Sequence, residues 1–405
     1  MAKLKVAIVA PPWLQIPPKG YGGIEVVLVG LIQELVKKDV DVEVFTVGAM
    51  PGFKSVKVHS LYKTEQYEHI HKPMYESLPI LAAHMLFSLE EIARQGDFDI
   101  IHDHNGFFGP ALLRWVGEVP GMPPAIHTHH GPPFTSNATL GQYIPDNRPF
   151  WRQLAATKRL FIVGISESLM RLTPKDLKDH VLPAVHNAID VTQFNFYPKK
   201  DDYFVTMARF NEDKGEHIAA ELCRKHHYRL KMAGTVAGIM TPKRLLLELA
   251  NPHSKYRNFA DFGYYSDKIL PFTALSKRIQ YVGNVSGRSK QRLLGLARAL
   301  LFPIQWEEPF GMAVIEAMAC GTPVVAMNRG AMPEIIQHGV NGFLANSVEE
   351  FEEYMTRVGE ISPEACRKSV EDHFSISKMA DDYIERYKEV IRRTKRPFGS
   401  PGLAA

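Results

Sequence analysis

Two glutamates that flank a proline–phenylalanine–glycine turn are the most specific chemical feature of the sequence. Glu308 and Glu316 have seven residues between them, and the glycine of the turn leads into an apolar run that predicts a helix. One carboxylate then lies in a loop and the other on the second turn of the helix, so both can face one ligand. The backbone N–H groups of Gly311, Met312 and Ala313 point toward the phosphates of such a ligand. Two unrelated surface glutamates are the alternative, which the glycine and proline on both sides disfavour.

Two cations, Arg209 and Lys214, follow the predicted strand 203–208, and Lys214 opens the next helix. The carboxyl end of a strand in a parallel sheet faces the crevice in which such sheets bind ligands. A guanidinium fork and a lysine point charge suit a pyrophosphate. A salt bridge with Glu212 or Asp213 at the helix start is the alternative, and the residues alone leave both interpretations open.

Gly22 and Gly23 lie between the first predicted strand, 6–10, and the first predicted helix, 24–38. Bare N–H groups and the helix dipole form a site for an anion at such a position. Glycines in this loop also serve as plain turn formers. The spacing is not G-x-G-x-x-G, which argues against a nicotinamide cofactor.

Histidines cluster around the ends of two predicted strands, at His102, His104, His127, His129 and His130. Imidazoles at strand ends are typical of metallohydrolases of the amidohydrolase type. That alternative needs one closed barrel and further ligands on later strands. The second half of the chain offers groups for phosphates and hydroxyls instead.

Apolar runs rich in β-branched residues alternate with helical stretches, a pattern typical of parallel sheets built from βαβ units. The predicted strands of the first half are 6–10, 42–47, 100–101, 125–127 and 160–164. Those of the second half are 203–208, 230–233, 279–282, 299–302 and 323–326. The fold class is therefore α/β with two doubly wound, Rossmann-like domains, and 251–275 is an insertion of irregular or helical structure.

Length and composition fit an ordinary globular enzyme. The chain has 405 residues, and at about 150 residues per domain this predicts two or three domains. A net charge of +4 spread over the whole length gives no argument for a nucleic-acid partner. The three cysteines are widely spaced and form neither a disulfide framework nor a zinc motif, so a cytoplasmic location is expected. We expect no membrane span, because no apolar stretch approaches the ~20 residues that one needs.

The motifs together resemble family 4 of the glycosyltransferases, which have the GT-B architecture. The segment from Glu308 to Glu316, EPFGMAVIE, matches the Glu-x7-Glu signature of that family. The resemblance covers nearly the whole chain, and its other motifs are YGGIE at 21–25, THHG at 128–131, VGISES at 163–168, HNAID at 186–190, ARFNEDKG at 208–215 and VGNV at 282–285. Ala188 stands where the family usually has the glycine of the interdomain linker.

The resemblance implies two domains that face each other across a cleft and a last helix that crosses back to the first domain. The expected domains are 1–190 on the acceptor side and 191–374 on the donor side, followed by the crossover helix and tail at 375–405. Basic residues within 388–396 either suit the C-terminus of that helix or form a patch for anionic lipid headgroups. A peripheral contact at the inner face of the membrane therefore stays open.

The resemblance also implies roles for the site residues. Arg209 and Lys214 would bind the diphosphate of the donor. Glu316 would bind the ribose hydroxyls and Glu308 the donor sugar. His130, in THHG, matches the family histidine that reaches the sugar, whereas a shift of one residue in register would place His129 there. The remaining donor contacts would come from Gly22, Gly23, Val285, Phe310, Gly311, Met312 and Ala313.

No metal is expected at this site, because cations and N–H groups already face the phosphates. Asp97-Phe98-Asp99 is formally the D-x-D metal motif of the other glycosyltransferase fold. It opens the strand that leads to His102, at the edge opposite the crevice, so a structural role is favoured.

The implied reaction is the retaining transfer of a hexosyl unit from a nucleotide diphosphate sugar to a glycan, lipid or small-molecule acceptor. No cofactor is required; a UDP-sugar is favoured as donor, and GDP- or ADP-sugars stay open. A nucleotide-sugar isomerase or epimerase and a non-catalytic nucleotide-sugar binder on the same fold are the alternatives. A metal-dependent hydrolase is a more remote one.

Overall fold

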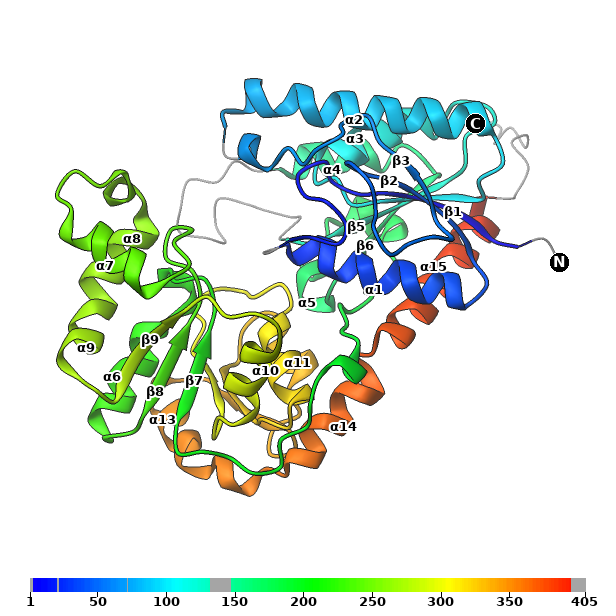
Figure 1. Ribbon diagram of the computed structural model, residues 1–405. Coiled ribbons are helices and arrows are strands. Elements are labelled where there is room, and N and C mark those ends of the chain that lie inside the picture. The colour runs from blue at the N-terminus through cyan, green and yellow to red at the C-terminus, as the bar shows by residue number, and fades with distance from the viewer. Residues whose placement is uncertain (1–2, 20–21, 71, 132–146, 395–405) are drawn as a thin grey trace. The chain divides into compact units, whose positions relative to one another are not determined.

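The computed structural model describes residues 3–19, 22–70, 72–131 and 147–394, which fold into two compact units (Figure 1). Residues 1–188 and 376–405 belong to the first unit, and residues 189–375 belong to the second. Each unit has a parallel β-sheet of six strands with helices packed against it. This arrangement confirms the predicted α/β class with two doubly wound domains.

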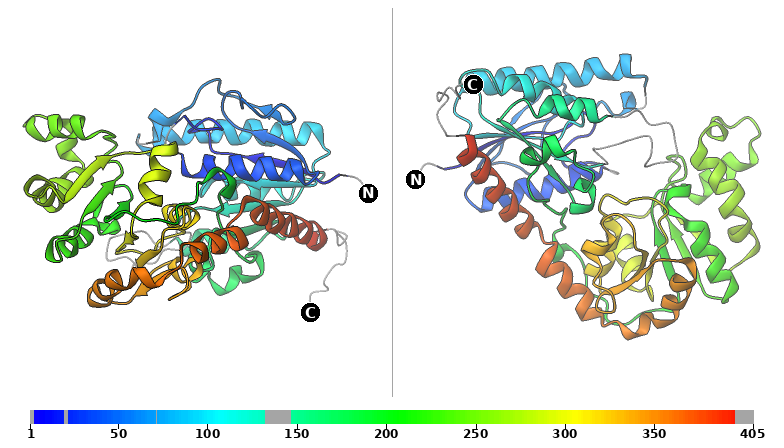
Figure 2. Two further views of the ribbon diagram at one scale, coloured as in Figure 1. Left: turned by 60° about the horizontal axis from the view of Figure 1, so that its bottom comes forward. Right: turned by 180° about the vertical axis from the view of Figure 1, so that it is seen from behind.

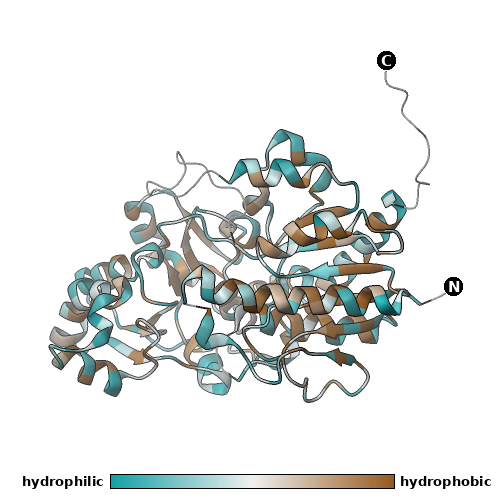
Figure 3. Ribbon diagram, turned by 90° about the horizontal axis from the view of Figure 1, so that it is seen from above, coloured by the Kyte–Doolittle hydropathy of each residue, from teal (hydrophilic) through white to brown (hydrophobic). Residues whose placement is uncertain are grey.

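The strands of the first unit follow the order β3-β2-β1-β4-β5-β6, which places a switch point between β1 and β4. They are β1 (Lys5–Val9), β2 (Asp41–Phe45), β3 (Lys57–His59), β4 (Ile100–Asp103), β5 (Ala125–His129) and β6 (Leu160–Gly164). The helices are α1 (Gly23–Lys37), α2 (Met74–Gln95), α3 (Phe108–Val116), α4 (Arg148–Leu154), α5 (Glu167–Met170) and α15 (Ile376–Thr394). Strands β4, β5 and β6 are buried over their whole length, as expected for a parallel sheet covered on both faces. In Figure 3 the strands are largely brown, while the helices carry both brown and teal faces.

The last helix, α15, packs against α1 and β5 of the first unit. Figure 2 shows it in red beside the strands of this unit. The two helices approach closely at Gly30, where an added Cβ atom would lie 2.7 Å from Cγ2 of Ile376. Tyr383 and Tyr387 of α15 are buried. The expected return of the last helix to the first unit is therefore confirmed.

The second unit repeats the plan with the strand order β12-β11-β10-β7-β8-β9, so its switch point lies between β7 and β10. The strands are β7 (Phe204–Met207), β8 (Leu230–Ala233), β9 (Ile279–Gly283), β10 (Leu300–Phe302), β11 (Val324–Met327) and β12 (Gly342–Ala345). The helices are α6 (Glu216–Lys225), α7 (Pro242–Ala250), α8 (Ala260–Tyr264), α9 (Leu270–Leu275), α10 (Gly287–Gly295), α11 (Met312–Ala319), α12 (Met332–Ile335), α13 (Val348–Arg357) and α14 (Pro363–His373).

Two strands of the first sheet are longer than the sequence predicts. β4 continues through His102 and Asp103, and β5 continues through Thr128 and His129. Their backbones stay paired with neighbouring strands up to these residues, and their polar side chains find partners inside the unit. Polar residues at a strand end look like loop in a sequence because their partners are distant. The segment 251–275 is largely helical, one of the two alternatives expected for this insertion, with α8 and α9 joined by a π-helical turn at Tyr265–Ile269.

Candidate functional site

The loops that follow β7 and β10 meet at the switch point of the second sheet. The loop after β7 carries Lys214, and the loop after β10 carries Glu308. Ligands of doubly wound sheets bind outside the carboxyl ends of the strands at such a point. The backbone N–H of Gln305 donates to the carbonyl of Asp213 over 2.7 Å, which joins the two loops directly.

Glu308 is held by two side chains through one of its oxygens. The Lys214 ammonium lies 2.5 Å from Oε2, and the indole Nε1–H of Trp306 donates to the same oxygen over 2.9 Å. The ammonium also lies 4.9 Å from the centre of the Trp306 ring, within range of a cation–π interaction. Glu308 is 9% exposed, so these contacts form in a largely desolvated position.

The backbone of Glu308 is fixed from the loop that follows β11. The N–H of Ala331 donates to the Glu308 carbonyl over 2.9 Å. Gly330 has φ +57°, and an added Cβ atom there would lie 2.3 Å from the Glu308 nitrogen. Only glycine therefore allows this close approach, which holds the loop against the end of the sheet.

Glu316 lies on the second turn of α11 and is paired with a lysine that the sequence did not single out. The Lys290 ammonium, from the first turn of α10, lies 2.6 Å from Oε1 of Glu316. The two signature glutamates thus each give one oxygen to a lysine. The other oxygen of each carboxylate makes no hydrogen bond or ion pair within the described residues, so it is available to a hydroxyl group.

The N-terminus of α11 lies between the two glutamates and has the features of an anion site. Gly311, the N-cap, has φ +100°, and no side chain of the described residues caps the helix there. The N–H groups of Met312 and Ala313 belong to the first turn, where no intrahelical partner exists. Phe310 is buried and packs edge-on against Phe374, which anchors the turn. The sequence predicted this helix start and the place of Glu316 on its second turn, and both are confirmed.

Two other predicted donor residues of the second unit make no hydrogen bond or ion pair with these lysine–glutamate pairs within the described residues. The Arg209 side chain is 63% exposed, and its Nε lies 3.8 Å from Oδ2 of Asp261, not beside Glu212 or Asp213. Burial raises the pKa of Asp261, and Arg209 opposes that rise. Val285 is half-buried between β9 and α10, next to Asn284, whose N–H donates to the carbonyl of Met240.

In the first unit, Gly22 is the N-cap of α1 and Gly23 is its first residue. An added Cβ atom at Gly22 would lie 2.8 Å from Cβ of Pro18 and 3.0 Å from a carboxylate oxygen of Glu25, so the position has no room for a side chain. Gly23 is exposed and open. Burial raises the pKa of the Glu25 carboxyl at this helix start.

His130 pairs with His104 at the carboxyl end of β4 and β5. Nδ1 of His104 lies 2.9 Å from Nε2 of His130, and Nε2 of His104 is buried without a partner in the described structure. A buried nitrogen without a partner is less costly as a lone pair than as an N–H group. We therefore assign the shared proton to His104 and the ring proton of His130 to its Nδ1. Burial first, and the nearby His127, lower the pKa of His130 to about 3, so the ring is neutral at pH 7.

The other histidines form a buried hydrogen-bond network. Asp103 bonds His127 over 2.6 Å, and His127 bonds His129 over 2.8 Å. The chain forms two open six-stranded sheets. The metallohydrolase alternative required a closed barrel, so its predicted fold is wrong. Within the described residues, no group of three or more histidine, cysteine, aspartate or glutamate side chains is arranged to hold a metal ion.

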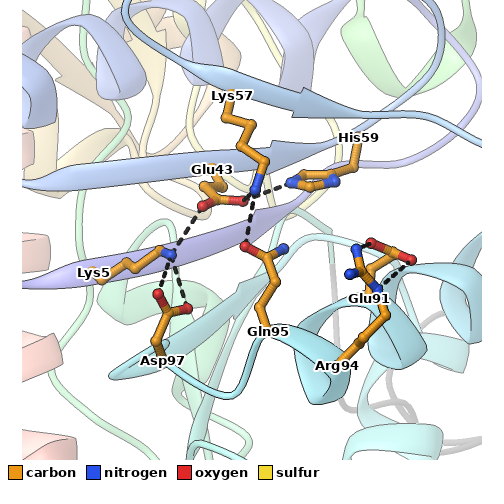
Figure 4. A network of polar contacts seen from close by, with 8 residues as sticks. All are labelled: Lys5, Glu43, Lys57, His59, Glu91, Arg94, Gln95 and Asp97. Carbon is orange, nitrogen blue, oxygen red and sulfur yellow. Dashed lines mark hydrogen bonds and ion pairs between the residues drawn. The ribbon is translucent and has the colours of Figure 1, made fainter.

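The D-x-D motif has the structural role that was favoured. The carboxylate of Asp97 accepts from the Lys5 ammonium, and Asp99 accepts from the Lys5 backbone N–H over 2.9 Å. Figure 4 shows Lys5 between Asp97 and Glu43, with Lys57 and His59 on the other side of Glu43. Burial alone would raise the pKa of Glu43, but hydrogen bonds from His59, Lys5 and Lys57 together lower it to about 2.

Comparison with known proteins decides the family. A family model described as "Glycosyltransferase Family 4" matches residues 21–193, and one described as "Glycosyl transferases group 1" matches residues 190–372. The chain belongs to glycosyltransferase family 4. These two matches overlap at residues 190–193, and together they span most of the sequence.

Relatives of this glycosyltransferase extend over the same length. A glycosyltransferase of Methanocaldococcus jannaschii is 23% identical over 359 residues, which covers 84% of each chain. The sucrose-phosphate synthase of Thermosynechococcus elongatus has 17% identity and a TM-score of 0.68, with 97% of this chain and 100% of that chain covered. The Anabaena protein HepE, solved in complex with UDP and glucose, has 16% identity and a TM-score of 0.62, with 95% and 100% covered. The fold is GT-B.

Sequence reasoning about this glycosyltransferase missed Trp306 and Lys290 as neighbours of the signature glutamates. Trp306 stands two positions before Glu308, and this proximity was the one available signal. Lys290 meets Glu316, which is 26 positions away, so no local spacing reveals it. The pairing of His104 with His130 agrees with the predicted histidine cluster. Within the described part of the chain, no helix combines the length and apolar character needed to span a bilayer.

Proposed function

We propose that this glycosyltransferase is retaining and moves a hexosyl unit from a nucleotide diphosphate sugar, with a UDP-sugar as the favoured donor, to an acceptor still to be identified. One observation carries the proposal. Glu308 and Glu316 flank the α11 N-terminus, and each has one carboxylate oxygen on a lysine while the other makes no hydrogen bond or ion pair within the described residues. UDP and glucose bound to HepE support the preference for uridine.

Neutralising the departing diphosphate is the first task of such a site. The Lys214 ammonium has three N–H donors, and one of them serves Glu308, so two are left for phosphate oxygens. The first-turn N–H groups of α11 add a fixed positive end at no cost of reorganisation. We assign Arg209 a supporting role at the diphosphate, because its exposed side chain is free to turn from the long contact with Asp261.

Holding the nucleoside and the sugar is the second task. We assign the ribose hydroxyls to Glu316, since Lys290 holds one of its carboxylate oxygens and leaves the other to accept from hydroxyl donors. The main chain around Val285 is assigned to the nucleobase. Gly22 and Gly23 are assigned to the donor because Gly23 is exposed and open, which lets a ligand approach the backbone at the start of α1.

Glu308 and His130 are assigned to the donor sugar. Neutral His130, with its proton on Nδ1, is suited to give a hydrogen bond to a sugar hydroxyl. Glu308 is suited to orient the sugar and to stabilise positive charge that develops at its anomeric carbon. Both residues position the sugar, and the retained configuration then results from attack on the face from which the diphosphate leaves.

The test is a donor screen on the intact chain. Calorimetry with UDP-, GDP- and ADP-sugars should give binding to one nucleotide class, with UDP-sugars expected. Mass spectrometry of the products then separates glycosyl transfer, which releases free nucleoside diphosphate, from isomerisation, which does not. An absence of binding to every nucleotide would contradict the proposal, and an isomerised sugar still attached to its nucleotide would support an epimerase.

A further inference from the structure

Trp306 touches both charged members of the Lys214–Glu308 pair. It lies in the loop after β10, and its indole N–H has one role, donation, which it uses on Oε2 of Glu308 over 2.9 Å. Its ring face lies 4.9 Å below the Lys214 ammonium. The side chain is half-buried, so both contacts are partly shielded from water.

These contacts determine how the Glu308 carboxylate is oriented toward a ligand. Lys214 and Trp306 both bind Oε2, so that oxygen is occupied by one charged and one neutral donor. Rotation of the carboxylate would break both bonds, and only a half-turn, which exchanges two equivalent oxygens, would restore them. Oε1 makes no hydrogen bond or ion pair within the described residues, so this side of the carboxylate is presented to a ligand. A lysine alone, on a flexible stem, would allow the carboxylate to turn.

We propose that Trp306 is a positioning residue for sugar transfer. Its N–H holds the orientation of Glu308, and its ring holds the place of Lys214. The inference rests on the proposed function, because it takes Glu308 to face the donor sugar. Trp306 itself acts through Glu308 and Lys214, and not through contact with the reacting atoms.

The decisive variant is Trp306→Phe, which removes the N–H donor and keeps an aromatic ring beneath Lys214. Trp115→Phe is a matched control, because Trp115 also lies under a cation, Arg114, at 4.7 Å, and is 70% exposed in the first unit. Circular dichroism and thermal melting establish that each variant folds. If Trp306→Phe melts far below the parent, Trp306→His, which restores a ring N–H, provides the second variant.

Measurements of kcat and of the Kd for UDP distinguish a positioning role of Trp306 from a purely structural one. With UDP-glucose, or the donor chosen by the screen, Trp306→Phe should lower kcat about 10-fold, as expected for a lost hydrogen bond to a charged group. The Kd for UDP should stay within about twofold, because the phosphate-facing donors remain. In a Glu308→Gln background the same substitution should have no further effect on kcat. An unchanged kcat, or losses that multiply in the double variant, would overturn the proposal.

A fluorescence titration tests the contact with Lys214 without any sugar transfer. Inorganic pyrophosphate that binds the Lys214 ammonium should change the tryptophan emission of the parent chain. The change should vanish in Trp306→Phe and in Lys214→Met, and persist in Trp115→Phe. If the emission change survives in Trp306→Phe, the proposal is wrong. If pyrophosphate gives the Trp306-dependent change but no donor is turned over, the fault lies with the proposed function and the coupling of Trp306 to Lys214 stands.

Discussion

At the scale of single residues, the two signature glutamates differ in what surrounds them. Within the described residues the Glu316 carboxylate has one partner, Lys290, and the residue lies on a helix. Glu308 has Lys214 and Trp306 on the same oxygen and lies in a loop whose backbone is held by Ala331. A carboxylate fixed so firmly is suited to the reacting end of a substrate, and one with a single partner to a recognition contact.

Variants of the two glutamates should therefore separate binding from turnover. Glu316→Gln should weaken UDP binding and turnover together, by ~1–3 kcal/mol, since its bonds to ribose are made in every bound state. Glu308→Gln should lower kcat and leave the Kd for UDP nearly unchanged, because it acts on the sugar. His130→Ala should behave like Glu308→Gln. Calorimetric titration of UDP beside donor turnover makes the comparison, and equal losses of UDP affinity in both glutamine variants would refute the division.

A buried carboxyl near Lys214 gives a second prediction. Glu216 is 2% exposed; burial raises its pKa to about 8, against hydrogen bonds from its own N–H and from Tyr264. Between the unfolded value near 4.5 and about 8, the folded chain holds one proton more than the unfolded chain. The carboxyl thus contributes stability at low pH that is lost as pH rises through this window.

The stability of Glu216→Gln relative to the parent chain should therefore increase as pH rises. The difference in free energy of unfolding between variant and parent should grow by about 1.4 kcal/mol per pH unit across the window and level off above it. Urea unfolding at several pH values measures the difference. Glu221→Gln, at an exposed position of the same helix, is the control and should show no such trend. A difference that is independent of pH would contradict the burial argument.

Residue spacing predicted part of this site and could not predict the rest. Glu308, Glu316 and the helix start between them are close in sequence, so a local pattern contains their arrangement. The contact between Lys214 and Glu308 spans 94 positions and follows from strand order, which brings the ends of β7 and β10 together. Lys214 was predicted as a phosphate ligand, but its pairing with Glu308 needed the structure.

At the scale of elements, α15 is tied to the first sheet by buried polar side chains. Nδ1 of His102 bonds the Tyr387 hydroxyl over 2.6 Å, and Nε2 bonds Thr128 over 2.7 Å. Thr128 in turn bonds Tyr383 over 3.0 Å. Burial, followed by the neighbouring His130 and His127, lowers the pKa of His102, so this ring is neutral at pH 7 and needs a partner at each nitrogen. The sequence predicted the helix and its apolar face. It did not predict the partners of the tyrosines, because His102 and Thr128 lie beyond the ends of the predicted strands.

Tyr387→Phe should destabilise the first unit more than Tyr383→Phe does. Loss of the Tyr387 hydroxyl leaves Nδ1 of His102 buried without a partner, at a cost of about 1–3 kcal/mol. Loss of the Tyr383 hydroxyl is milder, because Thr128 still bonds His102. Denaturant unfolding followed by circular dichroism gives both values. Equal effects of the two substitutions would show that His102 finds another partner or water.

At the scale of the whole molecule, the two units repeat one sheet plan but carry different chemistry at their switch points. The second unit has cations and an uncapped helix start beside two carboxylates, which suit a nucleotide. The first unit has a histidine cluster that includes the neutral His130, and a glycine-rich helix start. This contrast could be anticipated from the sequence, since lysines and glutamates dominate one set of motifs and histidines the other.

Nucleotide binding should accordingly be centred on the second unit and need no divalent ion, because Lys214 and the α11 N–H groups supply the positive charge that Mg²⁺ or Mn²⁺ supplies elsewhere. In hydrogen-exchange mass spectrometry, UDP with EDTA should slow exchange in 209–216, 284–291 and 306–316. Strands β4 and β5 of the first unit are the internal control and should change little. Adding Mg²⁺ should alter neither the protected segments nor the Kd by more than about twofold. Protection that appears only with the metal would show that the protein's own cations are insufficient, and protection confined to the first unit would place the nucleotide among the histidines.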